Sequence, residues 1–179
     1  MSFVTKRIMF AGFGGQGLLF SGKVIATAGL IDGREVTWLP SYGPEMRGGT
    51  ANCGVVISDE PIGSPLVHDP DVLVAMNLPS FVKFIDEVVP EGIVITDATL
   101  VKADTDRKDI RLFEVEATKI SKDEGLDGIS NMILLGKMIA ETGIASRETI
   151  EKAVQKCVPA SKSHLLEHNL RAIRLGMEL

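Results

Sequence analysis

The pattern in this sequence best suited to chemistry is a glycine-rich loop at residues 12–17, Gly-Phe-Gly-Gly-Gln-Gly, which satisfies G-x-G-x-x-G. An apolar run at residues 7–11 precedes the loop, and apolar residues at helical spacing follow it. Glycines permit a tight turn and a close backbone approach, while the first turn of a helix offers free N–H groups and partial positive charge. This context predicts a site for an anion such as phosphate, formed by Gly12, Gly14, Gly15, Gln16 and Gly17.

A second stretch of unusual composition runs over residues 40–53 and contains Arg47 followed by Gly48 and Gly49. It follows a predicted strand, and loops after the strands of an α/β sheet lie at the carboxyl edge, where ligands and partners bind. A guanidinium beside backbone N–H groups can hold an anion. The same residues also fit a loop in which Arg47 pairs with Glu45 and the glycines only turn the chain.

Two nucleotide-binding patterns are incomplete. A dinucleotide site needs an acidic residue at the end of the second strand to hold the ribose hydroxyls, but residues 38–42 contain none and Glu35 lies at the start of that strand. Residues 17–23 fit G-x-x-x-x-G-K, but Val24 stands where a phosphate-binding loop needs Ser or Thr to reach magnesium. The missing acidic residue argues against NAD binding. The missing Ser or Thr favours the interpretation that residues 17–23 are part of a helix.

Two histidines near the C-terminus, His164 and His168, fit the H-x-x-E-H spacing of inverted zinc proteases. Histidines at i and i+4 share a helix face, but few residues remain after them to supply a third ligand. We therefore predict a solvated helix face and no metal site. No residue of the chain has the pattern of a catalytic acid, base or nucleophile.

Composition narrows the class of protein. The chain has 179 residues, 45% of them hydrophobic and 24% charged, with a formal net charge of −5, which argues against nucleic-acid binding. Its two cysteines, Cys53 and Cys157, cannot hold a four-thiolate iron–sulfur cluster. No apolar run is long enough to span a membrane and no signal peptide is recognisable, so we expect a cytoplasmic protein.

The elements that must position these residues alternate between strand and helix. Predicted strands cover residues 7–11, 35–39, 51–58, 71–76, 92–97 and, at an edge, 112–116. Predicted helices cover residues 17–31, 79–89, 130–142, a stretch from Ser146 to about Val158, and a last one that Ser161 or Ser163 opens and that runs through Arg174. This order predicts one α/β domain over residues 1–179, with a mostly parallel sheet and a helical C-terminal part.

The two loops together resemble the γ subunit of the 2-oxoacid:ferredoxin oxidoreductases. That family couples a strand and G-x-G-G-Q-G to a downstream S-Y-G-P-E-x-R-G-G, and this chain carries both motifs, at residues 12–17 and 41–49. Residues 58–62, 70–75 and 131–136 also resemble family segments, so the resemblance covers essentially the whole chain. It implies a three-layer α/β/α, Rossmann-like unit.

The resemblance implies one part of a larger enzyme that decarboxylates a 2-oxoacid oxidatively, releases acyl-CoA and CO2, and reduces ferredoxin. Thiamine diphosphate, Mg²⁺ and iron–sulfur clusters are expected on other subunits: α, β and a ferredoxin-like δ subunit. This chain is expected to be non-catalytic and to help bind coenzyme A and assemble the complex. Its expected binding residues are those of the glycine loop together with Ser41, Tyr42, Arg47, Gly48 and Gly49.

The form of the second motif resembles the 2-oxoglutarate or branched-chain 2-oxoacid enzymes more than the pyruvate enzymes, without naming the substrate. Two other readings stay open at this point. One is a free-standing NAD-dependent enzyme, and the other is a stand-alone Rossmann-like module that binds a nucleotide or coenzyme A.

Overall fold

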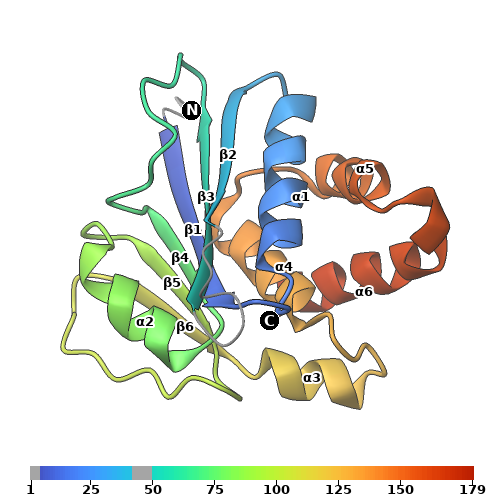
Figure 1. The fold of residues 1–179 in the computed structure, drawn as a ribbon. Coiled ribbons are helices and arrows are strands. Elements are labelled where there is room, and N and C mark those ends of the chain that lie inside the picture. The colour runs from blue at the N-terminus through green and yellow to red at the C-terminus, as the bar shows by residue number, and fades with distance from the viewer. Residues whose placement is uncertain (1–4, 42–49) are drawn as a thin grey trace.

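The computed structural model describes residues 5–41 and 50–179 and is built around one six-stranded sheet (Figure 1). The strand order across the sheet is β2-β3-β1-β4-β5-β6. The strands are β1 (Thr5–Phe13), β2 (Glu35–Ser41), β3 (Thr50–Ser58), β4 (Val72–Ala75), β5 (Ile93–Asp97) and β6 (Arg111–Val115). Each of the six predicted strands is present, and β6 is an edge strand as expected.

The sheet is mostly parallel, as predicted, because only β3 runs against the other strands. β1, β4, β5 and β6 pair in parallel, whereas β3 pairs antiparallel with both β1 and β2. This order differs from the usual dinucleotide-binding sheet, in which the second strand lies beside the first. Here the reversed β3 occupies that place and moves β2 to the edge.

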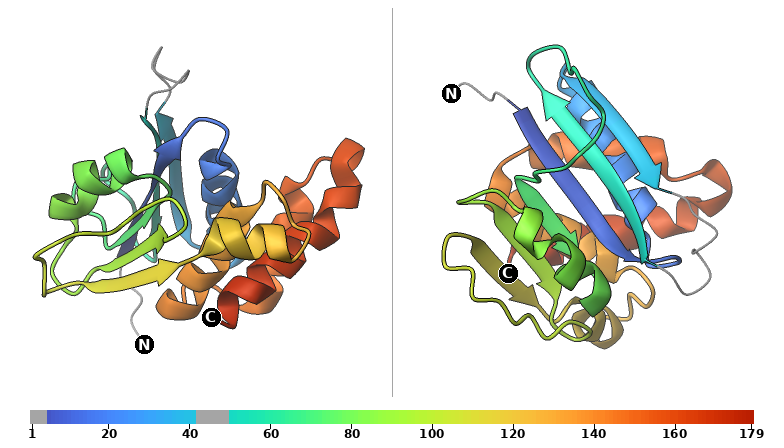
Figure 2. Two further views of the ribbon diagram at one scale, coloured as in Figure 1. Left: turned by 90° about the horizontal axis from the view of Figure 1, so that it is seen from below. Right: turned by 60° about the vertical axis from the view of Figure 1, so that its left-hand side comes forward.

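One face of the sheet, called here the α1 face, is covered by two layers of helix. α1 (Leu18–Ile31) and α4 (Ser130–Thr142) pack on the strands, and α5 (Arg147–Cys157) and α6 (Leu166–Met177) pack outside them (Figures 1 and 2). The buried side chains of this face form one large apolar cluster. α4, α5 and α6 are the helical C-terminal part that the sequence predicts, and α1 is the helix predicted after the glycine loop.

The opposite face, called the α2 face, has a thinner cover. α2 (Leu78–Phe84), the 3-10 turn η2 (Ile85–Glu87) and the coil segments 59–71 and 98–110 lie over it (Figure 2). A second, smaller apolar cluster that includes Met9, Leu73 and Phe81 fills the space between them. The two covered faces make the three-layer α/β/α arrangement that the family resemblance implies.

Two helices differ from their predicted bounds. The predicted helix over residues 79–89 ends earlier, because Val88 is extended and Val89 precedes Pro90, a position that disfavours helix. The last helix begins later, because the 3-10 segment η3 (Ala160–Leu165) contains the non-helical Lys162, and the apolar stripe of α6 starts at Leu166. The short helix α3 (Ala117–Asp123) lies before α4.

None of the helices in the described part of the chain is both long and apolar enough to cross a membrane.

Candidate functional site

The glycine loop lies where β1 ends, and the side chain of Gln16 holds its shape. The Phe13 N–H donates to Gln16 Oε1 at 2.6 Å, and Gln16 Nε2 donates to the carbonyl of Met76 at 3.1 Å. The Gln16 N–H in turn donates to the Phe13 carbonyl at 3.3 Å. The loop is therefore closed on itself and tied to the end of β4, the next parallel strand.

Gly17 ends the loop and starts α1 in a left-handed conformation, with φ 79° and ψ 15°. A Cβ on Gly17 would lie 2.5 Å from Asn131 Nδ2, so the position needs glycine both for its backbone and for its space. Asn131, from the first turn of α4, donates to the Gly17 carbonyl and to Ser21 Oγ, both at 3.1 Å. Asn131 belongs to a family segment that the sequence analysis noted, but its role beside the loop carried no local signal.

Three other residues of the predicted site differ in their exposure. Gly12 is buried at the end of β1, whereas Gly14 and Gly15 are exposed. Within the described ranges, the backbone N–H groups of Gly14 and Gly15 make no hydrogen bond. Among residues 5–41 and 50–179, the loop therefore has two backbone donors without a partner, on exposed residues at the carboxyl end of a strand.

The second predicted loop starts from the same edge of the sheet. Ser41, the last residue of β2, is exposed and stands opposite Asn52 of β3, which stands opposite Ala11 of β1. The strands that lead into the two loops therefore end at the same edge of the sheet, with β3 between them. The other predicted residues of this loop lie outside the described residues: Tyr42, Arg47, Gly48 and Gly49.

A pocket of about 210 Å³ opens beside the glycine loop. Its lining comes from the loop, from α3, from the α3–α4 connection and from the start of α4: Gly15, Gln16, Thr118, Ser121, Lys122, Asp127, Gly128 and Ser130. Lys122 is exposed and has no ion pair in the described part of the chain. It gives the pocket a cation that no motif in the sequence indicated.

Asp97 holds α3 against this edge. The carboxylate is fully buried at the end of β5 and accepts from the Thr118 N–H at 3.2 Å and from Thr118 Oγ1 at 2.5 Å. It also accepts from the Thr99 N–H at 3.1 Å. Since every one of these bonds is internal, Asp97 is a structural residue that positions Thr118 in the pocket wall.

The motifs judged incomplete in the sequence have plain structural explanations. Residues 18–23 belong to α1, so the G-x-x-x-x-G-K spacing lies on a helix and not on a loop. His164 and His168 are both exposed, and no group of three metal-ligating side chains occurs among the residues that the structure describes.

Both cysteines are buried. Burial raises the pKa of the Cys53 thiol from 9.0 to about 12, although a hydrogen bond with Trp38 acts in the opposite direction.

Comparisons with known proteins agree with one another. The family model for pyruvate ferredoxin/flavodoxin oxidoreductase matches residues 7–179. Subunit VorA of a ketoisovalerate oxidoreductase from Methanothermobacter thermautotrophicus is 42% identical over 178 residues, covering 98% of this chain and 36% of that protein. Subunit KorC of a 2-oxoglutarate synthase from Methanocaldococcus jannaschii is 37% identical, covering 98% of this chain and 94% of that protein.

Among solved structures, the gamma subunit of a keto/oxoacid ferredoxin oxidoreductase from Geobacter sulfurreducens matches with a TM-score of 0.83. It is 31% identical, and the match covers 97% of this chain and 96% of that chain. The present chain thus spans nearly the whole of two of these relatives but only about a third of VorA, which is a longer protein.

Proposed function

Because the chain belongs to the pyruvate ferredoxin/flavodoxin oxidoreductase family, we propose that it is the gamma subunit of a multisubunit 2-oxoacid:ferredoxin oxidoreductase. The complex would convert a 2-oxoacid and coenzyme A to an acyl-CoA and CO2, and pass two electrons to ferredoxin. The names of the relatives support 2-oxoglutarate or a branched-chain 2-oxoacid as the substrate. We place the complex in the cytoplasm, with α and β subunits and a ferredoxin-like δ subunit as partners.

The chain's own role in this proposal is binding and assembly. Thiamine diphosphate, Mg²⁺ and iron–sulfur clusters would be held by the partner subunits, in keeping with the two buried cysteines of this chain. Coenzyme A carries phosphate groups, and the carboxyl edge around the glycine loop has the donors that a phosphate requires. The single observation that carries this role is the N–H group of Gly15, which has no partner among the described residues and lies in the same pocket as the cation of Lys122.

The predicted residues divide by task in this proposal. Gly14, Gly15 and Lys122 would contact a phosphate of coenzyme A, and the Ser130 hydroxyl lines the same pocket. Gly12, Gln16 and Gly17 would shape the loop, because the Gln16 amide is already bonded within the protein. Ser41, Tyr42, Arg47, Gly48 and Gly49 would add a second cation and further donors from the neighbouring loop.

Lys122→Ala in the assembled enzyme tests the coenzyme A contact. We expect about a tenfold rise in the KM for coenzyme A, with the KM for the 2-oxoacid unchanged, because one charge-assisted hydrogen bond is lost. Lys119→Ala is the matched control, since Lys119 lies on the same helix but pairs with Glu116 outside the pocket. If the KM for coenzyme A is the same in both variants and the wild type, Lys122 does not contact coenzyme A.

Anaerobic purification of the tagged chain from its native cytoplasm tests the subunit assignment. We expect larger chains, iron and thiamine diphosphate to co-purify, together with viologen reduction that depends on both a 2-oxoacid and coenzyme A. Activity with a series of 2-oxoacids would then name the substrate. A pure, inactive chain without partners would instead support a stand-alone module that binds coenzyme A or a nucleotide.

A further inference from the structure

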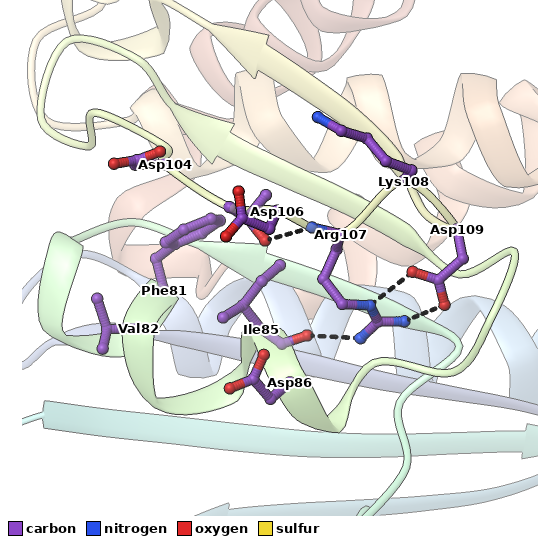
Figure 3. Close-up of a pocket in the computed structure, with 10 residues that line it drawn as sticks. Phe81, Val82, Ile85, Asp86, Asp104, Asp106, Arg107, Lys108 and Asp109 are labelled. Carbon is purple, nitrogen blue, oxygen red and sulfur yellow. Dashed lines mark hydrogen bonds and ion pairs between the residues drawn. The ribbon is translucent and has the colours of Figure 1, made fainter.

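The α2 face carries a second pocket, of about 690 Å³, between α2 and the coil that joins β5 to β6 (Figure 3). α2 and η2 form one wall, with Phe81, Val82, Ile85 and Asp86, and the coil between β5 and β6 forms the other, with residues 104–109. It shares no lining residue with the pocket beside the glycine loop.

Arg107 fixes the coil wall of this pocket in place. Its guanidinium donates to both carboxylate oxygens of Asp109 at 2.7 Å, and to the carbonyls of Ile85 and Val88 at 3.1 and 3.0 Å (Figure 3). The hydrogen bonds from Arg107 hold the pKa of Asp109 below its usual value, and Asp109 raises the pKa of Arg107. These two charges neutralise each other and are not available to a partner.

The remaining charges of the pocket are mostly acidic. Asp86, Asp104 and Asp106 are exposed and make no ion pair in the described part of the chain, although Asp86 lies close enough to Arg107 to help raise the pKa of that guanidinium. Lys108, the other cation of the lining, points away from the Arg107–Asp109 pair (Figure 3). No cluster of metal-ligating side chains occurs among residues 5–41 and 50–179, so the carboxylates are not grouped around one ion.

The coil wall also has an unpaired backbone. Along residues 102–108 the side chains alternate between exposed and half-buried, which is the pattern of an extended strand. Within the described chain this stretch makes no backbone–backbone hydrogen bond, and only the Arg107 N–H is used locally, by Thr105 Oγ1. Such a stretch can accept a strand from another chain through main-chain hydrogen bonds.

Exposed apolar side chains on α2 complete the surface. Val82 is 63% exposed and Leu78 is 45% exposed, and their i, i+4 spacing puts them on one side of the helix. Phe81 and Ile85 line the pocket between α2 and the coil. This surface therefore combines apolar side chains, three carboxylates without an ion pair among the described residues, and a stretch of backbone without hydrogen bonds to that part of the chain.

We propose that this pocket, which we name the α2 groove, docks a basic extended segment of a partner subunit. The segment would pair with the backbone of residues 102–108, place lysine or arginine side chains against Asp86, Asp104 and Asp106, and cover Val82 with an apolar side chain. Charge complementarity selects a basic partner, and the unpaired backbone selects an extended one over a helix. This inference rests on the proposed function, because the partner is a subunit of the same oxidoreductase.

Charge reversal in the purified complex is the first test. With Asp104→Lys/Asp106→Lys we expect at least a tenfold weaker association of this chain with its partner subunits, and in the wild-type complex an association that weakens as salt rises. Glu60→Lys/Glu178→Lys is the matched control, because it changes the net charge equally at exposed acids outside the groove. Both double variants are expected to keep the wild-type thermal midpoint, since all four residues are exposed.

Site-specific photo-crosslinking is the second test. A photoreactive side chain at Val82 is expected to capture a partner peptide rich in Lys and Arg, whereas the same group at Leu30, which is also 63% exposed, is expected to capture none. If the charge-reversed complex assembles normally and Val82 captures no basic peptide, the groove proposal is wrong and the subunit assignment stands. If the wild-type chain purifies without oxidoreductase subunits, both proposals are wrong.

Discussion

The two faces of the sheet bury their side chains in different ways. On the α1 face, two layers of helix enclose a large apolar cluster, and polar side chains buried there have partners, as with Asn131 beside Gly17 and Lys137 paired with Glu141. On the α2 face, a seven-residue helix, one 3-10 turn and two coil segments cover a smaller cluster. We therefore expect the larger apolar cluster of the α1 face to contribute most to the stability of the fold, and the α2 face to contribute less.

Buried polar groups without a partner separate the faces further. Of the described residues, the side-chain atoms buried without a hydrogen bond are Thr37 Oγ1, Asn77 Nδ2, Ser80 Oγ, Thr96 Oγ1 and Arg174 Nε, and of these only Arg174 Nε, on α6, has an ion-pair partner, Glu151 at 3.7 Å. Ser80 lies on α2 and Asn77 caps it, while Thr96 alternates along β5 with Ile95 of the α1-face cluster and so points to the α2 face. Such groups need water or a partner chain, so the α2 face is the less closed core.

The largest effect we predict is on the α1 face, where α4 and α6 cross. A Cβ on Gly136 would overlap the Ile173 carbonyl oxygen, which is backbone and cannot rotate away. Gly136→Ala is expected to lower the free energy of unfolding by about 3 kcal/mol and the thermal midpoint by about 6–12 °C. Gly63→Ala is the control in denaturant and thermal unfolding, since nothing lies within 4 Å of its Cβ. Equal midpoints for the two variants would mean that the helices are not in close contact.

An intermediate effect comes from Cys53, in the α1-face cluster. Burial raises the pKa of the Cys53 thiol from 9.0, its value in an unfolded chain, to about 12 in the native protein. Between these pH values the unfolded chain loses this proton and the native protein keeps it, so the free energy of unfolding falls as the pH rises. Between pH 8 and pH 10.5 we expect the wild type to lose about 2 kcal/mol relative to Cys53→Ala, which has no thiol to ionise. Urea unfolding of both proteins at the two pH values measures the difference. A difference that stays constant with pH would contradict the burial of this thiol.

The smallest effect is local and belongs to the α2 face. Arg107→Ala removes two hydrogen bonds to backbone carbonyls and the pairing with Asp109, so we expect the Glu91 amide, which donates to the Asp109 carbonyl, to exchange roughly tenfold faster. The Met76 amide, bonded to Ala11 inside the sheet, is the internal control and should be unchanged. A uniform change at both amides would mean that Arg107 stabilises the whole fold and not the coil wall.

Acid weakens the same contact in the wild type. Because Arg107 lowers the pKa of Asp109 below its usual 3.8, the pair stabilises the coil wall above that pH and is lost as the pH falls through the lowered pKa. Glu91 exchange, corrected for intrinsic rates, should therefore rise at low pH in the wild type but much less in Arg107→Ala.

Much of the fold follows from the sequence, because buried parallel strands read as continuous apolar runs and glycines mark their ends. The reversal of β3 was not predicted, although the short stretch between residues 41 and 50 is a usable signal, since a parallel crossover needs a dozen or more residues. The helix from residue 79 was predicted too long because its apolar spacing continues through η2, while the extended Val88 before Pro90 ends it.

The site was predicted only as far as its motifs reach. Gly14, Gly15 and Gln16 were predicted from their spacing, whereas Lys122 and Asn131, which the structure brings beside them, come from helices more than 100 residues further along the chain. A lone lysine or asparagine on a helix has no motif, and only tertiary packing brings it to the glycine loop. The sequence did not indicate the α2 groove for the same reason, since residues 102–108 have the composition of an ordinary polar loop.

Gln16 has a consequence for the energetics of recognition. The two hydrogen bonds of its side-chain amide hold the loop from Phe13 to Gln16 in one conformation in the absence of a ligand. The loop therefore loses its conformational entropy during folding. In the proposed binding of a coenzyme A phosphate, the loop would therefore add little ordering cost to the desolvation and the loss of ligand freedom that association always requires. If the proposed site is correct, the loop is preorganised for it, and replacing Gln16 is expected to lower the affinity for coenzyme A by making the free loop less ordered, with every contacting group still present.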